Sequence, residues 1–362
     1  MKKMLMKNPV LSIGALLALA TTMIVGLREE TLLSIDWRTL FLLLGLLLVG
    51  EGLKSTGVMA RLGEAALCIA PRKRPLAILL VALPFLVASV LTNDVALVLF
   101  VPFALSLAHC FSQQEVGRIV VFQTIAANLG AMATPMGSPQ NLFLSSQAGW
   151  GFPAVWHMAW PYVLAAAGIL LVLLLFLIED GEVCAAVQSQ EMGTVGSLLY
   201  GVALLLGALA VSRVLRVEIF LMVAIGVSKF LGDRGLLRVD WGLLATFFVF
   251  FIFVGNLGAM AGVRTTVEGL VGAHPMATAL LLSQVMSNVP ATLFLFPFTK
   301  NLPALFLGVN LGGLGTLIAS MASLISYRMV RRESLLGTKD YLLTFTFYNL
   351  LVLGLLLLLT LL

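Results

Sequence analysis

Long apolar runs separated by short polar or basic segments dominate this chain. Few charged residues interrupt the runs 9–27, 39–50, 162–178, 198–212, 241–254 and 341–362. A helix needs about 20 mainly apolar residues to cross a bilayer. Although 39–50 and 241–254 are shorter, the pattern predicts an all-α polytopic membrane protein with about nine spanning helices. The expected helices are 9–27, 37–53, 117–146, 154–178, 196–212, 216–232, 240–258, 303–326 and 340–362.

Two short polar tips interrupt apolar runs that are otherwise continuous. Thr92-Asn93-Asp94 separates 75–91 from 95–110, and Ser287-Asn288-Val289-Pro290 lies within 275–299. A Pro-Phe pair follows each tip asparagine at the same spacing. A polar, non-helical tip at membrane depth is tolerated only where protein buries it or where it lines a watery cavity. The tips therefore predict two re-entrant hairpins, at 75–110 and 275–299.

Two of the expected helices contain residues that interrupt a helix. In 117–146 we expect breaks at Asn128-Leu129-Gly130 and from Thr134 to Pro139, and in 303–326 a break from Asn310 to Thr316. Pro and Gly in these stretches release backbone groups that cavity water or a ligand can satisfy. The sequence thus predicts two broken helices.

The polar positions of these segments recur in order along the chain. Asn128, Gly130, Thr134 and Ser138 recur as Asn310, Gly312, Thr316 and Ser320 with identical internal spacing, and Asp36-Trp37 recurs as Asp240-Trp241. We therefore expect two repeats, 1–178 and 196–362, joined by a linker at 179–195. An odd number of crossings separates the first helix from its counterpart, so the second repeat would be inverted. The alternative is an ordinary bundle with packing glycines.

Composition and charge support a membrane protein and suggest its orientation. Hydrophobic residues make up 60% of the chain, charged residues 11%, and the mean hydropathy is +1.06. The net charge of +5 is not a nucleic-acid signal, because Lys and Arg lie between the apolar runs. Most of them fall on the side of the N-terminus, which predicts a cytoplasmic N-terminus and an outer C-terminus in a bacterial inner (plasma) membrane. The exceptions are Arg28, Arg38, Arg213, Arg216, Arg264 and Lys300.

The two tips and the two broken helices would bring binding groups together. Each break exposes a helix N-terminus, whose free N–H groups and partial positive charge bind anions without Arg or Lys. Asn, Ser and Thr oxygens and free carbonyls suit Na⁺. The first half would contribute Asn93, Thr134 and Ser138, and the second half Ser287, Asn288, Thr316 and Ser320. The alternative is that these residues only cap half-helices.

Asp94 is a candidate coupling residue. It follows Asn93 and opens the half-helix 95–110, whereas Val289 occupies the matching place in the second tip. An ionised carboxylate aimed at the anion site would repel the substrate, so we expect Asp94 to handle a cation or a proton. The alternative is a simple helix cap.

These motifs resemble a known family. Thr92-Asn93-Asp94 and Ser287-Asn288-Val289 are similar to the Ser-Asn-Thr motifs of the divalent anion:sodium symporters, and the segments from Asn128 to Asn141 and from Asn310 to Ser320 are similar to that family's interrupted helices. Within the ion transporter superfamily, the run 91–96 and the segment from Thr134 to Asn141 look closest to the arsenite-permease and citrate-carrier-like branch. The resemblance covers about 36 to 326. Asp94 and Val289 replace the motif threonines, so the family's sodium stoichiometry and dicarboxylate choice are not carried over.

The residues and the resemblance together define candidate sites. The substrate candidates are Thr92, Asn93, Thr134, Pro135, Gly137, Asn141, Ser287, Asn288, Pro290 and Thr316. The candidates for Na⁺ are Asn93, Asn128, Gly130, Thr134, Ser138, Ser287, Asn288, Asn310, Gly312 and Ser320.

The function expected from the sequence is secondary active transport of a small anion, a carboxylate or an inorganic oxyanion. Alternating access would couple it to Na⁺ or H⁺ in a homodimer that needs no cofactor and binds no nucleic acid. No HExxH, GxSxG or Walker sequence is present, so an enzyme is not expected. One alternative is a Na⁺/H⁺ antiporter with Asp94 as the cation site. Another is a membrane scaffold or a channel without coupled transport, although a channel would need a continuous polar path.

Overall fold

The computed structural model describes residues 9–26, 35–90, 92–183, 193–211, 214–239, 241–333 and 337–361. In this part of the chain the regular structure is helical, and the strand-like pairing is one isolated antiparallel bridge between Arg72 and Glu182. Large apolar side chains cover much of the helix surface, and Phe176, for example, is 84% exposed. Such exposure suits lipid-facing helices. The prediction of an all-α polytopic membrane protein is confirmed at this level.

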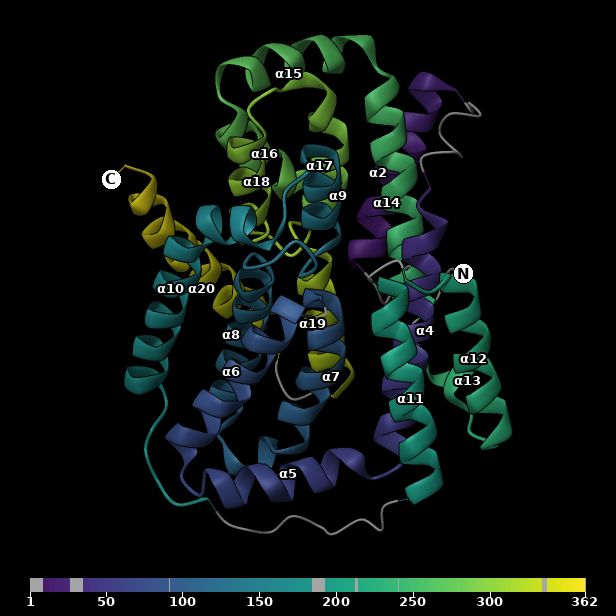
Figure 1. Ribbon diagram of the computed structural model, residues 1–362, viewed down its shortest axis with the longest axis vertical. Coiled ribbons are helices and arrows are strands. Elements are labelled where there is room, and N and C mark those ends of the chain that lie inside the picture. The colour runs from purple at the N-terminus through teal and green to yellow at the C-terminus, as the bar shows by residue number, and fades with distance from the viewer. Residues whose placement is uncertain are drawn as a thin grey trace.

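One helical bundle forms the right side of Figure 1. Its helices are α2 (Pro9–Val25), α4 (Trp37–Ser55), α11 (Thr194–Val211), α12 (Val217–Phe230), α13 (Gly235–Arg238) and α14 (Trp241–Ala259). Helix α2 packs against α14, and α4 packs against α11 and α12. The fit around Phe220 depends on small neighbours, because a Cβ at Gly45 would lie 2.4 Å from its ring. We call this group the α4 bundle.

A second bundle, on the left of Figure 1, contains both tips and both interruptions. Its helices are α6 (Lys73–Val90), α7 (Asn93–Ser106), α8 (Gln113–Ala131), α9 (Pro139–Ala148), α10 (Phe152–Leu177), α16 (Pro275–Met286), α17 (Asn288–Leu295), α18 (Leu302–Leu311), α19 (Met321–Glu333) and α20 (Thr338–Leu358), with the 3₁₀ turns η1 (Ala108–Cys110), η2 (Phe296–Phe298) and η3 (Leu359–Leu361). Two helices, α5 (Val58–Ile69) and α15 (Ala261–Ala273), lie across opposite ends of the view. We call the second group the tip bundle.

The order of elements is the same in the two halves of the chain. In each half, two helices meet at a polar tip, a helix interrupted by a non-helical segment follows, and a long helix comes last. Figure 1 shows α6 and α7 in the half of the molecule next to α5, and α16 and α17 in the half next to α15. The two tips therefore approach the middle of the molecule from opposite ends.

Length and composition alone mark few complete membrane spans. Among the described helices, α6, α10 and α20 are each long and apolar enough to cross a bilayer. A fourth candidate joins Leu244–Ala259 to α15, with a bend of 84° between them. The helices α7, α16, α17 and α18 are apolar but shorter. The expectation of about nine spans and two re-entrant hairpins stays a prediction.

The helix interruptions differ from the expected breaks. Helix α8 continues to Ala131, so Asn128-Leu129-Gly130 is helical and the break expected there is wrong; the non-helical segment is 132–138. Asn310 is also helical, and the second non-helical segment is 312–320. Close helix packing explains the difference, because a Cβ at Gly130 would lie 2.0 Å from the Phe85 carbonyl oxygen of α6. Gly130 serves helix contact here and does not interrupt the helix.

Some expectations fall outside the described residues. These are the linker positions 184–192, Asp240, and the basic residues Lys2, Lys3, Lys7, Arg28 and Arg213. The described start of the linker lies beside the start of α6, where Asp180 forms an ion pair of 2.7 Å with Arg72 and the Lys73 N–H donates to the Gly181 carbonyl at 2.9 Å.

The close approach of α8 to α6 leads to a testable prediction. Gly130→Ala should destabilise the fold, because overpacking typically costs about 1–3 kcal/mol. Gly168→Ala in α10 is the matched control, because no atom lies within 4 Å of its added Cβ. The midpoint of thermal unfolding in detergent should fall for the first variant and hold or rise for the second. Equal midpoints would refute the packing role of Gly130.

Candidate functional site

The first tip is held by side chains from three segments. Thr92 caps α7 by accepting a hydrogen bond from the Val95 N–H at 3.3 Å. The Asn93 backbone N–H donates to the Gly137 carbonyl at 3.1 Å, and its Nδ2 donates to Asn128 Oδ1 at 2.9 Å. These bonds fasten the tip both to α8 and to the non-helical segment that follows it.

The second tip is held in the same manner. The Asn288 backbone N–H donates to the Ala319 carbonyl at 3.0 Å, and Thr316 Oγ1 donates to the Gln284 carbonyl at 2.9 Å. Ser287 has a φ of 73°, a left-handed conformation that non-glycine residues adopt at a cost. The tip conformation is therefore imposed by its surroundings.

The hydrogen bonds of the two halves correspond residue by residue. In the first half Thr134 Oγ1 donates to the Ser89 carbonyl, as Thr316 Oγ1 does to the Gln284 carbonyl in the second. Ser89 and Gln284 each lie three residues before the first residue of their tip. The sequence repeat is thus accompanied by the same local bonding.

A buried polar centre joins the two halves. Asn128 Oδ1 accepts from Ser320 Oγ at 2.9 Å as well as from Asn93, and Asn310 Nδ2 donates to Asn141 Oδ1 at 2.8 Å. None of these five residues is more than 5% exposed. A buried polar group without a partner costs about 1–3 kcal/mol, so these bonds fix the first tip and the two interrupted helices relative to one another.

Several predicted site residues are packed against other parts of the protein and do not face open space. The space that a Cβ would need at Gly130 and Gly312 is filled by the backbone of α6 and α16, so both glycines allow close helix contact, and their role in binding Na⁺ stays a prediction. The Gly312 carbonyl accepts from Gln284 Nε2 at 2.8 Å. Gly137 turns the chain tightly, because a Cβ there would lie 2.1 Å from the Ala131 carbonyl oxygen. Pro290 is buried in the first turn of α17, and Pro135 is half-buried.

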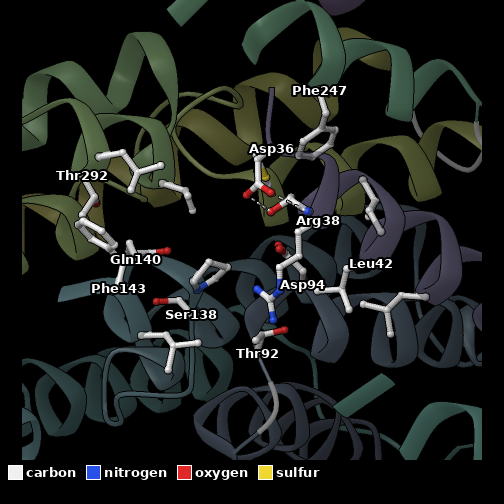
Figure 2. Close-up of a pocket in the computed structure, with 18 of the residues that line it drawn as sticks. Asp36, Arg38, Leu42, Thr92, Asp94, Ser138, Gln140, Phe143, Phe247 and Thr292 are labelled. Carbon is white, nitrogen blue, oxygen red and sulfur yellow. Dashed lines mark hydrogen bonds between the residues drawn. The ribbon is translucent and has the colours of Figure 1, made fainter. Parts of the chain in front are cut away.

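A cavity of about 120 Å³ lies between the α4 bundle and the tip bundle. Figure 2 shows Arg38 and Asp94 near its centre, with Gln140 and Ser138 on one side. Leu42, Leu46, Phe143 and Phe247 supply apolar walls. Of the predicted site residues, those that line the cavity are Thr92, Asp94 and Ser138.

Two oxygen atoms of the cavity lining lack a hydrogen-bond partner. They are Asp94 Oδ1 and Gln140 Oε1, both buried, and Gln140 as a whole is 3% exposed. Leaving such acceptors unpaired costs about 1–3 kcal/mol each. The cavity therefore suits a ligand that brings a proton donor or a positive charge.

The sequence analysis did not predict Arg38, Asp36 and Gln140 as site residues. Arg38, which the charge pattern places on the outer side, lines the cavity, and its Nη2 donates at 2.7 Å to the carbonyl of Ala210 near the end of α11. Asp36 caps α4 by accepting from the Thr39 N–H at 3.0 Å. An arginine in the first turn of an apolar helix was the available signal, because an ionisable residue at membrane depth is a functional candidate by default.

Comparison with known proteins identifies the family. The model of the citrate transporter family matches residues 2–304. The chain belongs to this family. Inner membrane protein YbiR of Escherichia coli (strain K12) is 35% identical over 306 residues, which cover 82% of this chain and 80% of that protein. An uncharacterised transporter of Methanocaldococcus jannaschii is 28% identical over 82% of this chain and 81% of its own length. The prediction of a membrane transporter, and not an enzyme, is confirmed.

A more distant relative matches a shorter region. The silicon efflux transporter of Oryza sativa subsp. japonica is 29% identical over 160 residues, which cover 43% of this chain and 33% of that protein.

The buried centre predicts contrasting effects of two serine substitutions. Ser320→Ala should lower the free energy of unfolding by about 0.5–1.5 kcal/mol, because it removes a donor to Asn128. Ser323→Ala, also fully buried, should be neutral or stabilising, because its hydroxyl has no partner. Thermal unfolding of both variants in detergent measures the difference. A larger loss for Ser323→Ala would contradict the assigned bond.

Proposed function

We propose that this membrane transporter carries a small anion, a carboxylate or an inorganic oxyanion, by secondary active transport coupled to H⁺ or Na⁺. The observation that carries the proposal is the cavity between the bundles, which Arg38, Asp94 and Gln140 line beside the first tip. An arginine suits oxyanions because its planar donors match their geometry. Membership of the citrate transporter family and the similarity to a silicon efflux transporter support the substrate range.

The arrangement of the helices supports two inverted repeats. Helix α2 packs against α14, and the corresponding pair α12 and α4 also packs together, as a two-fold relation requires. The helix pairs α6–α7 and α16–α17 lie in opposite halves of the molecule, which suits re-entrant hairpins entering from opposite faces. Sites between such repeats, near the middle of the membrane, are typical of secondary transporters.

The boundary between the bundles supports alternating access. A second cavity, of about 40 Å³, lies on the same boundary, and beside it Arg332 of α19 forms an ion pair of 2.6 Å with Glu51 of α4. A shift of the tip bundle along α4 would open one cavity to its side of the membrane and close the other.

The distribution of basic residues supports an orientation with the α5 end in the cytoplasm. Arg61 lies in α5, the run Arg72-Lys73-Arg74 follows that helix directly, and Arg332 of α19 pairs with Glu51 near the end of α4 that leads into α5. Basic residues favour the cytoplasmic side. We therefore propose that the α5 end lies in the cytoplasm and that the protein lies in an inner membrane, as the name of the Escherichia coli relative states for that protein.

Asp94 is the proposed coupling residue. Its unpaired Oδ1 and the unpaired Oε1 of Gln140 also suit a cation, which keeps Na⁺/H⁺ antiport as the second candidate function. Both functions require a carboxylate at this position, and they differ in whether an anion moves.

A proteoliposome experiment tests the proposed function. Uptake of labelled citrate, malate, sulfate and phosphate is measured under a pH gradient and, separately, under a Na⁺ gradient. Asp94→Asn should keep anion binding, seen as a thermal shift, but lose at least about tenfold of gradient-driven uptake, because the coupling charge is removed. The matched control is Asp340→Asn, which also changes an aspartate in the first turn of a helix, but an exposed one.

The outcomes separate the candidates. Unchanged gradient dependence in Asp94→Asn would reduce Asp94 to a helix cap. Exchange of Na⁺ for H⁺ without anion movement would favour the antiporter. Anion flux that follows only its own gradient, in the unaltered protein, would favour a channel.

A further inference from the structure

We infer that Glu51 of α4 and two arginines of α19, Arg328 and Arg332, form a latch that holds the two bundles together at the α5 end of their boundary. The latch would break whenever the tip bundle moves along α4, so it would favour the state in which the α5 end is closed. The inference rests on the proposed alternating access and adds the residues that control one side of it.

The latch lies at the opposite end of α4 from the larger cavity. Arg38 lines the cavity of about 120 Å³, and Glu51 lines the cavity of about 40 Å³. The two residues lie about 20 Å apart along the axis of α4, because a helix rises about 1.5 Å per residue. Near Glu51 the bundles are in tight contact, since a Cβ at Gly50 would lie 2.8 Å from Val98 Cγ1 of α7. The boundary therefore has more room at the Arg38 end than at the Glu51 end.

Two polar contacts join the bundles at the Glu51 end. Arg332 Nη1 lies 2.6 Å from Glu51 Oε1, and Arg328 Nη2 donates to Thr246 Oγ1 at 3.2 Å. Glu51 and Thr246 belong to α4 and α14 of the α4 bundle, whereas both arginines belong to α19 of the tip bundle. Residues four positions apart lie on the same face of a helix. One face of α19 thus makes both contacts.

Partial burial strengthens these contacts relative to an ordinary surface ion pair. The Glu51 side chain is 15% exposed and the Arg332 side chain 45%, and Thr246 is fully buried. Exposed ion pairs contribute little because water and salt screen them, and burial reduces this screening. A displacement of the tip bundle along α4 would separate both pairs of residues. The contacts therefore favour the arrangement seen in this structure by a moderate amount.

Two bonds at the Arg38 end, by contrast, stay within the α4 bundle. Arg38 Nη2 donates to the Ala210 carbonyl, and Asp36 accepts from the Thr39 N–H. On the tip bundle side of the same cavity, Asp94 Oδ1 has no hydrogen-bond partner. These two bonds need not break when the tip bundle moves. We therefore expect changes to the latch to alter the balance between the two ends of the boundary.

Thiol labelling at both ends of the boundary tests the latch. Leu42→Cys places a thiol in the larger cavity and Ile325→Cys places one in the smaller cavity, where Ile325 is 1% exposed. Each is made in the full-length protein without its three native cysteines. In lipid nanodiscs both faces of the membrane are accessible to a water-soluble maleimide. The ratio of the two labelling rates then reports which end of the boundary is open.

Removing the ion pair should shift that ratio toward the α5 end. Glu51→Gln should raise the labelling rate of Ile325→Cys about threefold or more and lower that of Leu42→Cys, because the populations of the two states change together. Glu51→Arg should have a larger effect, since it places a like charge opposite Arg332. Combining it with Arg332→Glu should bring the ratio back toward that of the unaltered pair.

Two further variants separate a latch from a general loss of stability. Glu64→Gln is the matched control, because it breaks an exposed ion pair of 3.1 Å with Arg61 that lies within α5. Thr246→Val removes the acceptor of Arg328 and should shift the ratio in the same direction as Glu51→Gln. A merely structural role would lower the midpoint of thermal unfolding and leave the ratio unchanged. If Glu51→Arg does not fold, Glu51→Gln and Thr246→Val decide.

An unchanged labelling ratio in the Glu51 variants, or an equal shift in Glu64→Gln, would overturn the inference. The labelling needs no substrate, so its result is independent of the uptake assay. Absence of transport in proteoliposomes would refute the proposed function, whereas transport with an unchanged labelling ratio would refute the latch alone.

Discussion

The structure depends on satisfying polar groups inside an apolar protein. Helices that end in the middle of a membrane protein leave backbone N–H and C=O groups that lipid cannot pair. Here the amide of Asn128 accepts from Asn93 and from Ser320, and so binds a tip of the first half to the non-helical segment of the second. The same amide chemistry joins Asn310 to Asn141.

The need to pair buried polar groups explains why few of the polar side chains near the tips line the cavity between the bundles. Most asparagine and threonine side chains near the tips are used to hold backbone, as in the bond from Thr134 to Ser89. The cavity between the bundles is lined by other groups from both of them, among them Arg38, Asp94 and Gln140. The residues of the polar centre hold the helices that surround the cavity, and other residues supply the polar groups that line it.

The sequence was enough to predict the tips and the interrupted helices, but it predicted only some of the contacts between them. The tips at Asn93 and Asn288 could be found because a polar residue within an apolar run has few physical explanations. The helical state of Gly130 could not, since it depends on the backbone of α6 beside it. Arg38 was also missed as a site residue, because its place in the cavity follows from the packing of α4 against a tip far away in sequence.

Glycine contacts also decide which parts of the molecule can move past one another. At Gly130 and Gly312, helix backbones lie in close contact. Helix α8 therefore packs against α6, and α18 against α16, in a fixed register. Across the bundle boundary, Phe247, Phe250 and Phe251 instead face residues such as Met286 and Met321. Such contacts are non-directional and adapt to displacement. In the proposed alternating access, the tip bundle would therefore move as one rigid unit, and the phenylalanine side chains of α14 would let it slide past the α4 bundle.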